Sequence, residues 1–99
     1  MISKSPGSKP DTVLVTFRLP ATIWAETVHL VGDFNGWNRH SHPLTRSRED
    51  ECWQITLEFE RNRVFQFRYL VNGTDWQNDW CADRYVPNPF GGDNSVLET

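Results

Sequence analysis

The chain has 99 residues, of which 37% are hydrophobic, 23% charged and 13% aromatic, and its formal net charge is −3. This length closes one hydrophobic core and predicts a single domain. The basic residues are scattered among acidic ones, which argues against nucleic acid or an anionic membrane as a partner. No apolar run approaches the length of a membrane span.

The start of the chain and its two cysteines bear on targeting, disulfide bonding and metal binding. The polar start MISKSPGSKPDT lacks the apolar stretch of a signal peptide, so we expect a cytoplasmic protein if Met1 is the native start. Cys52 and Cys81 are too few for a disulfide framework and have no metal-ligand spacing. They predict two reduced thiols.

Taken in chain order, residues 1–10 predict a flexible tail of Ser, Lys, Pro and Gly, and residues 11–99 predict one domain. TVLVTFRLP at 12–20 alternates apolar and polar residues and indicates a half-buried strand. ETVHLVGDF at 26–34 repeats that pattern and runs into the bend GDFNGW. A polar loop follows, with a short strand expected around Leu44.

The second half of the chain contains the clearest alternation. CWQITLEFE at 52–60 and NRVFQFRYLVNG at 62–73 predict two strands joined by a turn at 60–63. Asn72-Gly73 favours a tight turn with positive φ at both residues. PNPFGG then predicts a loop, and a last short strand begins at about Asn94.

No segment shows helical periodicity over the length that a helix needs. Six to eight short strands with regularly spaced turns predict an all-β fold, an immunoglobulin-like antiparallel β-sandwich. The strand alternation assigns five rings to its core, namely Phe17, Trp53, Phe59, Phe67 and Tyr69. Trp24, in a loop, could cap the core or contact a partner.

Four further rings lie in turns and loops beside Asn, Asp, Gln and Gly: Trp37, Trp76, Trp80 and Phe90. Any one of them could fold back over an end of the sandwich, but one small core has limited room for all four. Flat rings beside amides suit a pyranose, which has an apolar C–H face and a rim of hydroxyls. Two stacks and a few hydrogen bonds predict a dissociation constant of roughly 0.1–1 mM.

Three stretches carry a resemblance to a known family: VHLVGDFNGWN, FQFRYLVNG followed by DWQND, and PNPFGGDNSV. Together they resemble the family 48 carbohydrate-binding modules. This family includes the glycogen-binding domain of the AMP-activated protein kinase beta subunit and the early-set domain at the front of isoamylases and branching enzymes. The resemblance extends from about residue 12 to the end of the chain.

The resemblance implies a role for particular residues in binding α-1,4-linked glucan. Trp37 and Trp76 resemble the two stacking tryptophans of the family, and Asn94 resembles the amide that bonds sugar hydroxyls. Arg68 stands where glycogen-binding members have a Lys, and Phe90 stands where they have a Leu that packs on the glucan. Trp80 would extend the aromatic platform.

Other chemistry is less well supported by the sequence. Carboxylates at Asp33, Asp75, Asp79 and Asp83 invite a glycosidase interpretation, but a small sandwich rarely builds the deep cleft that such a pair needs. His40 and His42 lack a third metal ligand. We therefore expect no catalysis, no metal and no cofactor.

The leading hypothesis is a bacterial, cytoplasmic, non-catalytic module that binds glycogen or starch-like glucan. The alternative is a protein–protein docking module, related to the early-set domain of family 13 glycoside hydrolases, that accompanies a glucan-processing enzyme. A fragment or relative of such an enzyme is a third possibility.

Overall fold

The computed structural model describes residues 1–20, 25–49, 51–89 and 91–99. Trp24, whose role the sequence leaves open, lies outside the described residues. Within them the chain forms nine strands and one short 3-10 turn, η1. The elements in chain order are β1 (Ile2–Pro6), β2 (Thr12–Pro20), β3 (Val28–Gly32), η1 (Asp33–Asn35), β4 (Thr45–Ser47), β5 (Cys52–Glu60), β6 (Val64–Val71), β7 (Asp75–Gln77), β8 (Arg84–Pro87) and β9 (Asp93–Glu98).

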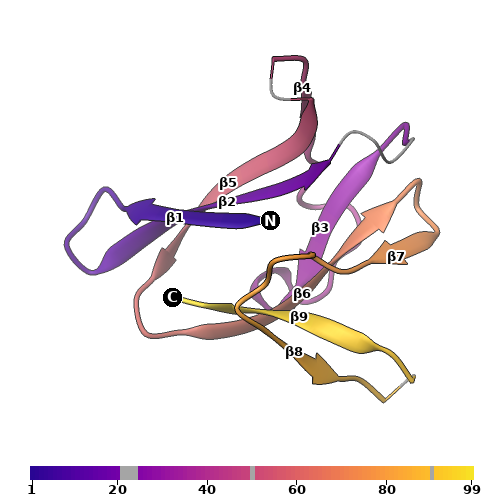
Figure 1. The fold of residues 1–99 in the computed structure, drawn as a ribbon. Helices are drawn as coiled ribbons and strands as arrows, with labels where there is room; N and C mark the ends of the chain where they lie inside the picture. The colour runs from indigo at the N-terminus through magenta and orange to yellow at the C-terminus, as the bar shows by residue number, and fades with distance from the viewer. Residues whose placement is uncertain (21–24, 50, 90) are drawn as a thin grey trace.

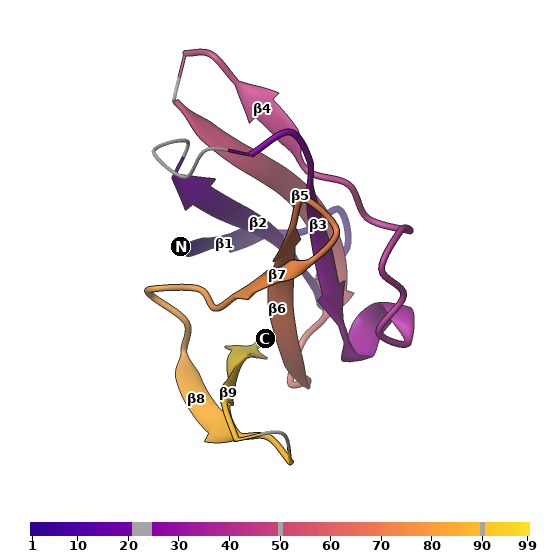
Figure 2. The same ribbon diagram turned by 90° about the vertical axis from the view of Figure 1, so that its right-hand side faces the viewer.

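The strands form two antiparallel sheets (Figure 1). The first sheet has the order β1-β2-β5-β4, and the second has the order β3-β6-β9-β8, with β7 pairing on β6. Figure 2 shows β4 at one end of the molecule and the β8–β9 pair at the other. The prediction of an all-β sandwich is confirmed.

The core lies between the two sheets and is built by the alternation visible in the sequence. Side chains point alternately to the two faces of a strand, so every second residue of β2, β5 and β6 faces inward. Phe17 on β2 is fully buried, and its ring centroid lies 5.2 Å from that of Phe67 on β6. All five rings that the sequence assigns to the core are buried, as predicted.

The first strand corrects an expectation. The composition of residues 1–10 predicts a flexible tail, but Ile2–Pro6 pairs with β2 along its whole length. Backbone hydrogen bonds to an edge strand need no apolar pattern, so side-chain composition could not reveal β1. Ile2 packs against the core, and Lys4 forms an ion pair of 2.7 Å with Asp83.

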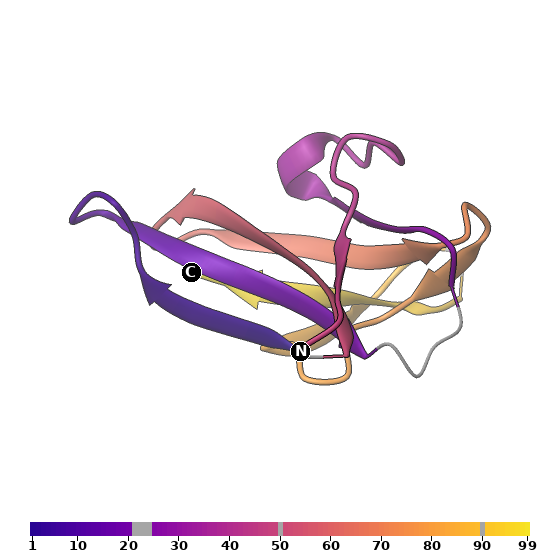
Figure 3. The same ribbon diagram turned by 90° about the horizontal axis from the view of Figure 1, so that it is seen from above.

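The outer face of the second sheet carries the side chains of β6 that do not point into the core. Residues directly opposite each other in a ladder point to the same face. Val31 of β3 stands opposite Arg68, and Leu70 stands opposite Trp76 of β7, so these four share the face turned away from the core. Figure 3 shows η1 and the loop after it standing clear of the strands.

Two smaller expectations can be compared with the structure. Cys52 is buried, Cys81 is exposed, and the structure has both as free cysteines. In the described part of the chain, no helix has the length and apolar character that crossing a membrane requires.

Candidate functional site

The bend after β3 is held by the side chain of Asn35. Its Oδ1 accepts a hydrogen bond of 3.1 Å from the Gly32 N–H, and its Nδ2 donates one of 3.0 Å to the Leu30 carbonyl. Phe34 turns inward, with its ring centroid 5.5 Å from that of Phe59. This packing anchors the bend on the core.

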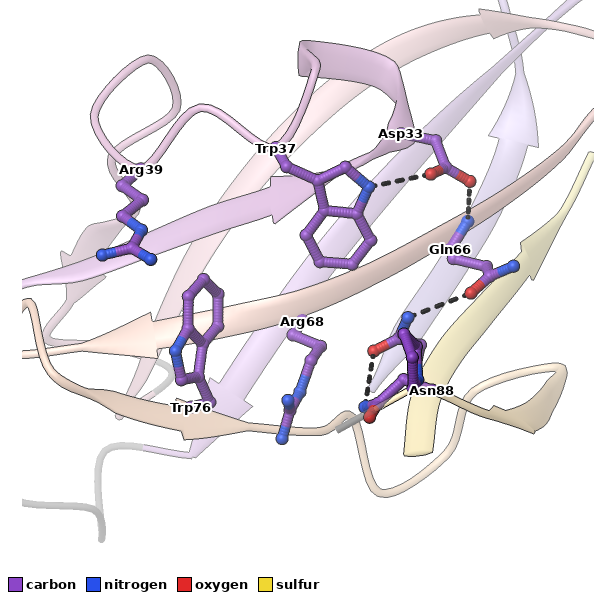
Figure 4. Close-up of a pocket in the computed structure, with 9 residues that line it drawn as sticks. Asp33, Trp37, Arg39, Gln66, Arg68, Trp76 and Asn88 are labelled. Atoms are coloured by element: carbon purple, nitrogen blue, oxygen red, sulfur yellow. Dashed lines mark hydrogen bonds between the residues drawn. The ribbon is translucent and has the colours of Figure 1, made fainter. Parts of the chain in front are cut away.

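Trp37 leaves the bend in a backbone conformation that is unusual for a bulky residue. Gly36 has φ of 64° and Trp37 has φ of 59°, both in the left-handed region. The indole Nε1 of Trp37 donates a 2.9 Å hydrogen bond to Asp33 Oδ1, and the other carboxylate oxygen accepts 2.8 Å from the Gln66 N–H. Asp33 thus ties the indole to β6, as Figure 4 shows.

The second indole is positioned by the hairpin that joins β6 to β7. Asn72 and Gly73 have φ of 53° and 73°, so the positive φ predicted at both turn residues is present. The turn folds β7 back so that Trp76 stands opposite Leu70 on the outer face of the sheet. Trp76 therefore lies on the same face as Arg68.

A groove of about 500 Å³ lies on this face. Its volume falls within the range of small-molecule sites. It brings together four residues that the sequence proposes for sugar contact: Trp37, Arg68, Trp76 and Asn94. The other residues that line it are Asp33, Arg39, Gln66, Asn88 and Pro89.

Side-chain amides form a chain along one side of the groove. Asn94 Nδ2 donates a 3.0 Å hydrogen bond to Gln66 Oε1, and Asn94 Oδ1 accepts one of 3.3 Å from Asn88 Nδ2. These bonds orient the Asn94 amide before any ligand arrives. Gln66 and Asn88 are therefore supporting residues that the sequence analysis does not identify.

Arg39 is the second addition made by the structure. Its guanidinium carbon lies 5.5 Å from the ring centroid of Trp76, and that of Arg68 lies 5.7 Å from the same centroid. Both are within cation–π range. Figure 4 shows both arginines beside the indole of Trp76. Arg39 belongs to a loop without alternation, so no sequence pattern indicates where it points.

One candidate residue is not brought into the groove, and another is not described. Trp80 is 65% exposed and is absent from the groove lining. Phe90 lies outside the described residues, so the structure adds nothing to the role expected for it.

The four carboxylates considered for catalysis do not converge on one place. Of these four, Asp33 alone lines the groove. Asp79 is buried and accepts a 2.6 Å hydrogen bond from the Tyr69 hydroxyl, while Asp83 pairs with Lys4. Within the described ranges, no group of three or more His, Cys, Asp or Glu side chains is placed to hold a metal ion.

One buried titratable group lies behind the site. Burial raises the pKa of the Tyr69 hydroxyl well above its ordinary value, and the negative charge of Asp79 and their hydrogen bond raise this pKa further. Tyr69 belongs to the core side of β6, so it supports the strand that carries Arg68 and does not reach the groove.

Comparisons with known proteins point in one direction. Residues 7–90 match the family described as Carbohydrate-binding module 48 (Isoamylase N-terminal domain). The chain is 30% identical over 67 residues to the 1,4-alpha-glucan branching enzyme GlgB of Butyrivibrio fibrisolvens, an alignment that covers 65% of this chain and 10% of the enzyme. It is 33% identical over 73 residues to the GlgB of Mycobacterium tuberculosis (strain ATCC 25618 / H37Rv), covering 70% of this chain and 9% of the enzyme. The chain thus spans only about a tenth of the length of these relatives.

Proposed function

Since the chain belongs to the carbohydrate-binding module 48 family, we propose that it is a non-catalytic module that binds α-1,4-linked glucan in the groove on the outer face of the β3–β6–β9 sheet. Trp37 and Trp76 stack on glucose rings. Arg68 and Asn94 bond the sugar hydroxyls. Phe90 shapes the rim, as the family resemblance implies.

The observation that carries this proposal is the convergence of two indoles on one groove. Trp37 and Trp76 are 39 positions apart in the sequence, yet both line the same groove with Arg68 and Asn94. Neither indole belongs to the buried core. Stacked indoles can cover the apolar face of a pyranose while the amides and the guanidinium groups bond its hydroxyl rim.

The relatives support the choice of glucan. Their printed name is 1,4-alpha-glucan branching enzyme, and the part of each enzyme that this chain resembles is small. We infer the same class of polymer for this chain, bound and not processed.

The decisive experiment compares two Trp→Ala variants by affinity electrophoresis in gels that contain glycogen or amylopectin. Trp37→Ala removes a stacking face worth roughly 1–1.5 kcal/mol, so we expect binding to weaken about five- to tenfold. Trp80→Ala is the matched control, because Trp80 is more exposed and lies outside the groove lining. It should migrate in the glucan gel as the unmodified protein does.

The melting temperatures of both variants complete the test. Trp37 is only half-buried, so its loss should lower the melting temperature by no more than a few degrees. A large drop for Trp37→Ala, or equal retardation of that variant and the unmodified protein, would contradict the assigned stacking role.

Docking to a glucan-processing enzyme is the second candidate. The observation in its favour is that Trp80 and Tyr85 are 65% and 44% exposed and do not line the groove. Exposed aromatic side chains are common anchors at protein interfaces. A titration with maltoheptaose, followed by tryptophan fluorescence, separates the two: no change at millimolar sugar would favour docking over glucan binding.

A further inference from the structure

The groove contains more positive than negative charge. Two guanidinium groups, Arg39 and Arg68, and one carboxylate, Asp33, line it among the described residues. The ion pairs formed within the described part of the chain include neither arginine. An arginine stays charged at any pH at which the protein is folded. The groove is therefore a locally positive place on a chain whose formal net charge is −3.

Asp33 forms no ion pair with either arginine in the described part of the chain. One carboxylate oxygen accepts from the indole of Trp37 at 2.9 Å, and the other accepts from the backbone N–H of Gln66 at 2.8 Å. Both bonds hold the bend against β6 and fix the position of Trp37.

The guanidinium groups are donors at the groove that form no hydrogen bond among the described residues. The amide oxygens of Gln66 and Asn94 already accept bonds from Asn94 and Asn88. By contrast, Arg68 Nε is buried and has no hydrogen-bond partner among the described residues. The interactions found there for the Arg39 and Arg68 guanidinium groups are the contacts with the indole of Trp76 (Figure 4).

A ligand that matches this groove should bring acceptors and negative charge. Sugar hydroxyls donate as well as accept, so a neutral glucan leaves the surplus positive charge uncompensated. A phosphate monoester brings three acceptor oxygens and a charge of about −1.5 to −2 at neutral pH. Guanidinium groups bind such oxyanions in a matching fork geometry.

We propose that the groove prefers glucan that carries phosphate monoesters on its glucose units, and that Arg39 and Arg68 recognise the phosphate. This preference rests on the proposed glucan binding, since it adds a charged group to the ligand of the same groove. Trp37 and Trp76 provide the stacking faces, and the arginines beside Trp76 provide the selectivity.

The experiment measures binding to one polymer in two forms, a phosphate-bearing amylopectin and the same amylopectin after phosphatase treatment. The readout is the ratio of the two dissociation constants from affinity electrophoresis at low ionic strength. For the unmodified protein we expect the phosphorylated form to bind about three- to tenfold more tightly, as one exposed charge-assisted hydrogen bond allows. Added salt should reduce this ratio because it screens exposed charges.

Charge-removing variants assign the preference to the groove. Arg39→Gln and Arg68→Gln should each move the ratio toward one. Arg46→Gln removes the same charge from β4, in the sheet that does not contribute to the groove, and should keep the ratio of the unmodified protein. Each ratio is taken on protein whose melting temperature matches the unmodified chain, so that a folding defect is not mistaken for lost recognition.

The possible results distinguish a failure of the phosphate preference from a failure of the proposed glucan binding. Equal binding of both polymer forms by the unmodified protein overturns the phosphate preference and leaves glucan binding intact. A preference that survives both Arg39→Gln and Arg68→Gln overturns the assignment to this groove. Binding to neither polymer overturns the proposed function, and the phosphate preference falls with it.

Discussion

Trp37 combines local backbone strain with a proposed role in ligand binding. A bulky residue in the left-handed region costs of the order of 1–3 kcal/mol, and such strain persists only where surrounding contacts impose it. Here the Trp37 N–H donates 2.9 Å to the Gly32 carbonyl, and its indole donates to Asp33. The ring is therefore held in place before a sugar arrives, which reduces the ordering cost of binding.

The bend that holds Trp37 depends on Asn35, and this gives a prediction at the same scale. Asn35→Ala leaves the buried Gly32 N–H and the Leu30 carbonyl without their partners, so we expect the free energy of unfolding to fall by about 2 kcal/mol. Glucan binding should weaken as well, because the bend loosens. Urea unfolding measures the first effect and affinity electrophoresis the second.

Asn38→Ala is the control for this change. Asn38 is exposed and accepts one hydrogen bond of 2.8 Å from the His40 N–H, outside the core of the bend. Its loss should change the free energy of unfolding by no more than about 0.5 kcal/mol. If the two variants unfold at the same urea concentration, the stabilising role assigned to Asn35 is wrong.

At the scale of single elements, β6 serves two functions at once. Its inward residues Phe67 and Tyr69 are fully buried, while Gln66 and Arg68 line the groove on the opposite face. Because one strand carries both sets, core packing on one side fixes the position of the groove residues on the other. A groove built on a strand is held more rigidly than one built on loops alone.

Tyr69 makes the stability of this element depend on pH. Its pKa is raised in the folded protein, first by burial and then by Asp79, whereas in the unfolded chain it titrates near its ordinary value of 10.0. The raised pKa stabilises the fold fully below about pH 10, and this contribution is lost as the pH rises above that value. We expect the melting temperature to fall more steeply above pH 10 than it does for Tyr69→Phe.

The Tyr69→Phe variant needs its own baseline at neutral pH. Removing the hydroxyl takes one donor from Asp79, which keeps the Cys81 N–H at 2.8 Å and the ammonium group of Met1. The variant should be destabilised at pH 7 by about 1–2 kcal/mol. The two proteins are compared between about pH 9 and 11, a range that includes the ordinary pKa of tyrosine. If their melting temperatures fall in parallel over this range, the pH dependence assigned to Tyr69 is wrong.

At the scale of the whole molecule, the two sheets differ in what they contribute to the groove. The described residues that line the groove come from η1, β6, β7, β9 and neighbouring loops, and none of them comes from the β1-β2-β5-β4 sheet. That sheet contributes the opposite wall of the core, where Phe17 contacts Phe34, Phe59 and Phe67. Stability and binding can therefore be altered separately.

Phe17→Ala tests this separation. Truncating a fully buried ring costs about 3–5 kcal/mol, a large part of the stability of a small domain. We expect the urea midpoint to fall sharply while the affinity of the remaining folded protein for glucan stays within about twofold. The second part is checked by measuring the affinity at about 10 °C, close to the temperature at which small domains are most stable. The measured affinity is corrected for the fraction of the protein that is folded. A selective loss of affinity would show that the groove depends directly on the β2 wall.

Much of the core could be predicted from local pattern alone. Alternation along 12–20, 52–60 and 62–73 identifies strands and inward residues, because side-chain direction in a strand depends only on its two-residue period. The same period places Arg68 on the outward face, in agreement with its register opposite Val31. Asn72-Gly73 likewise determines its turn through the φ values that the two residues tolerate.

What the sequence by itself determined, then, is the longer strands, their core faces and the conformation of the Asn72-Gly73 turn. Only the tertiary structure decided that Ile2–Pro6 pairs with β2, that Arg39 lies on Trp76, and that Trp80 stays outside the groove lining. The pairing of β1 depends on backbone hydrogen bonds with the next strand, and the position of Arg39 depends on a contact with a segment far along the chain. Loop direction and edge pairing follow from such contacts, and no short-range period in the sequence encodes them.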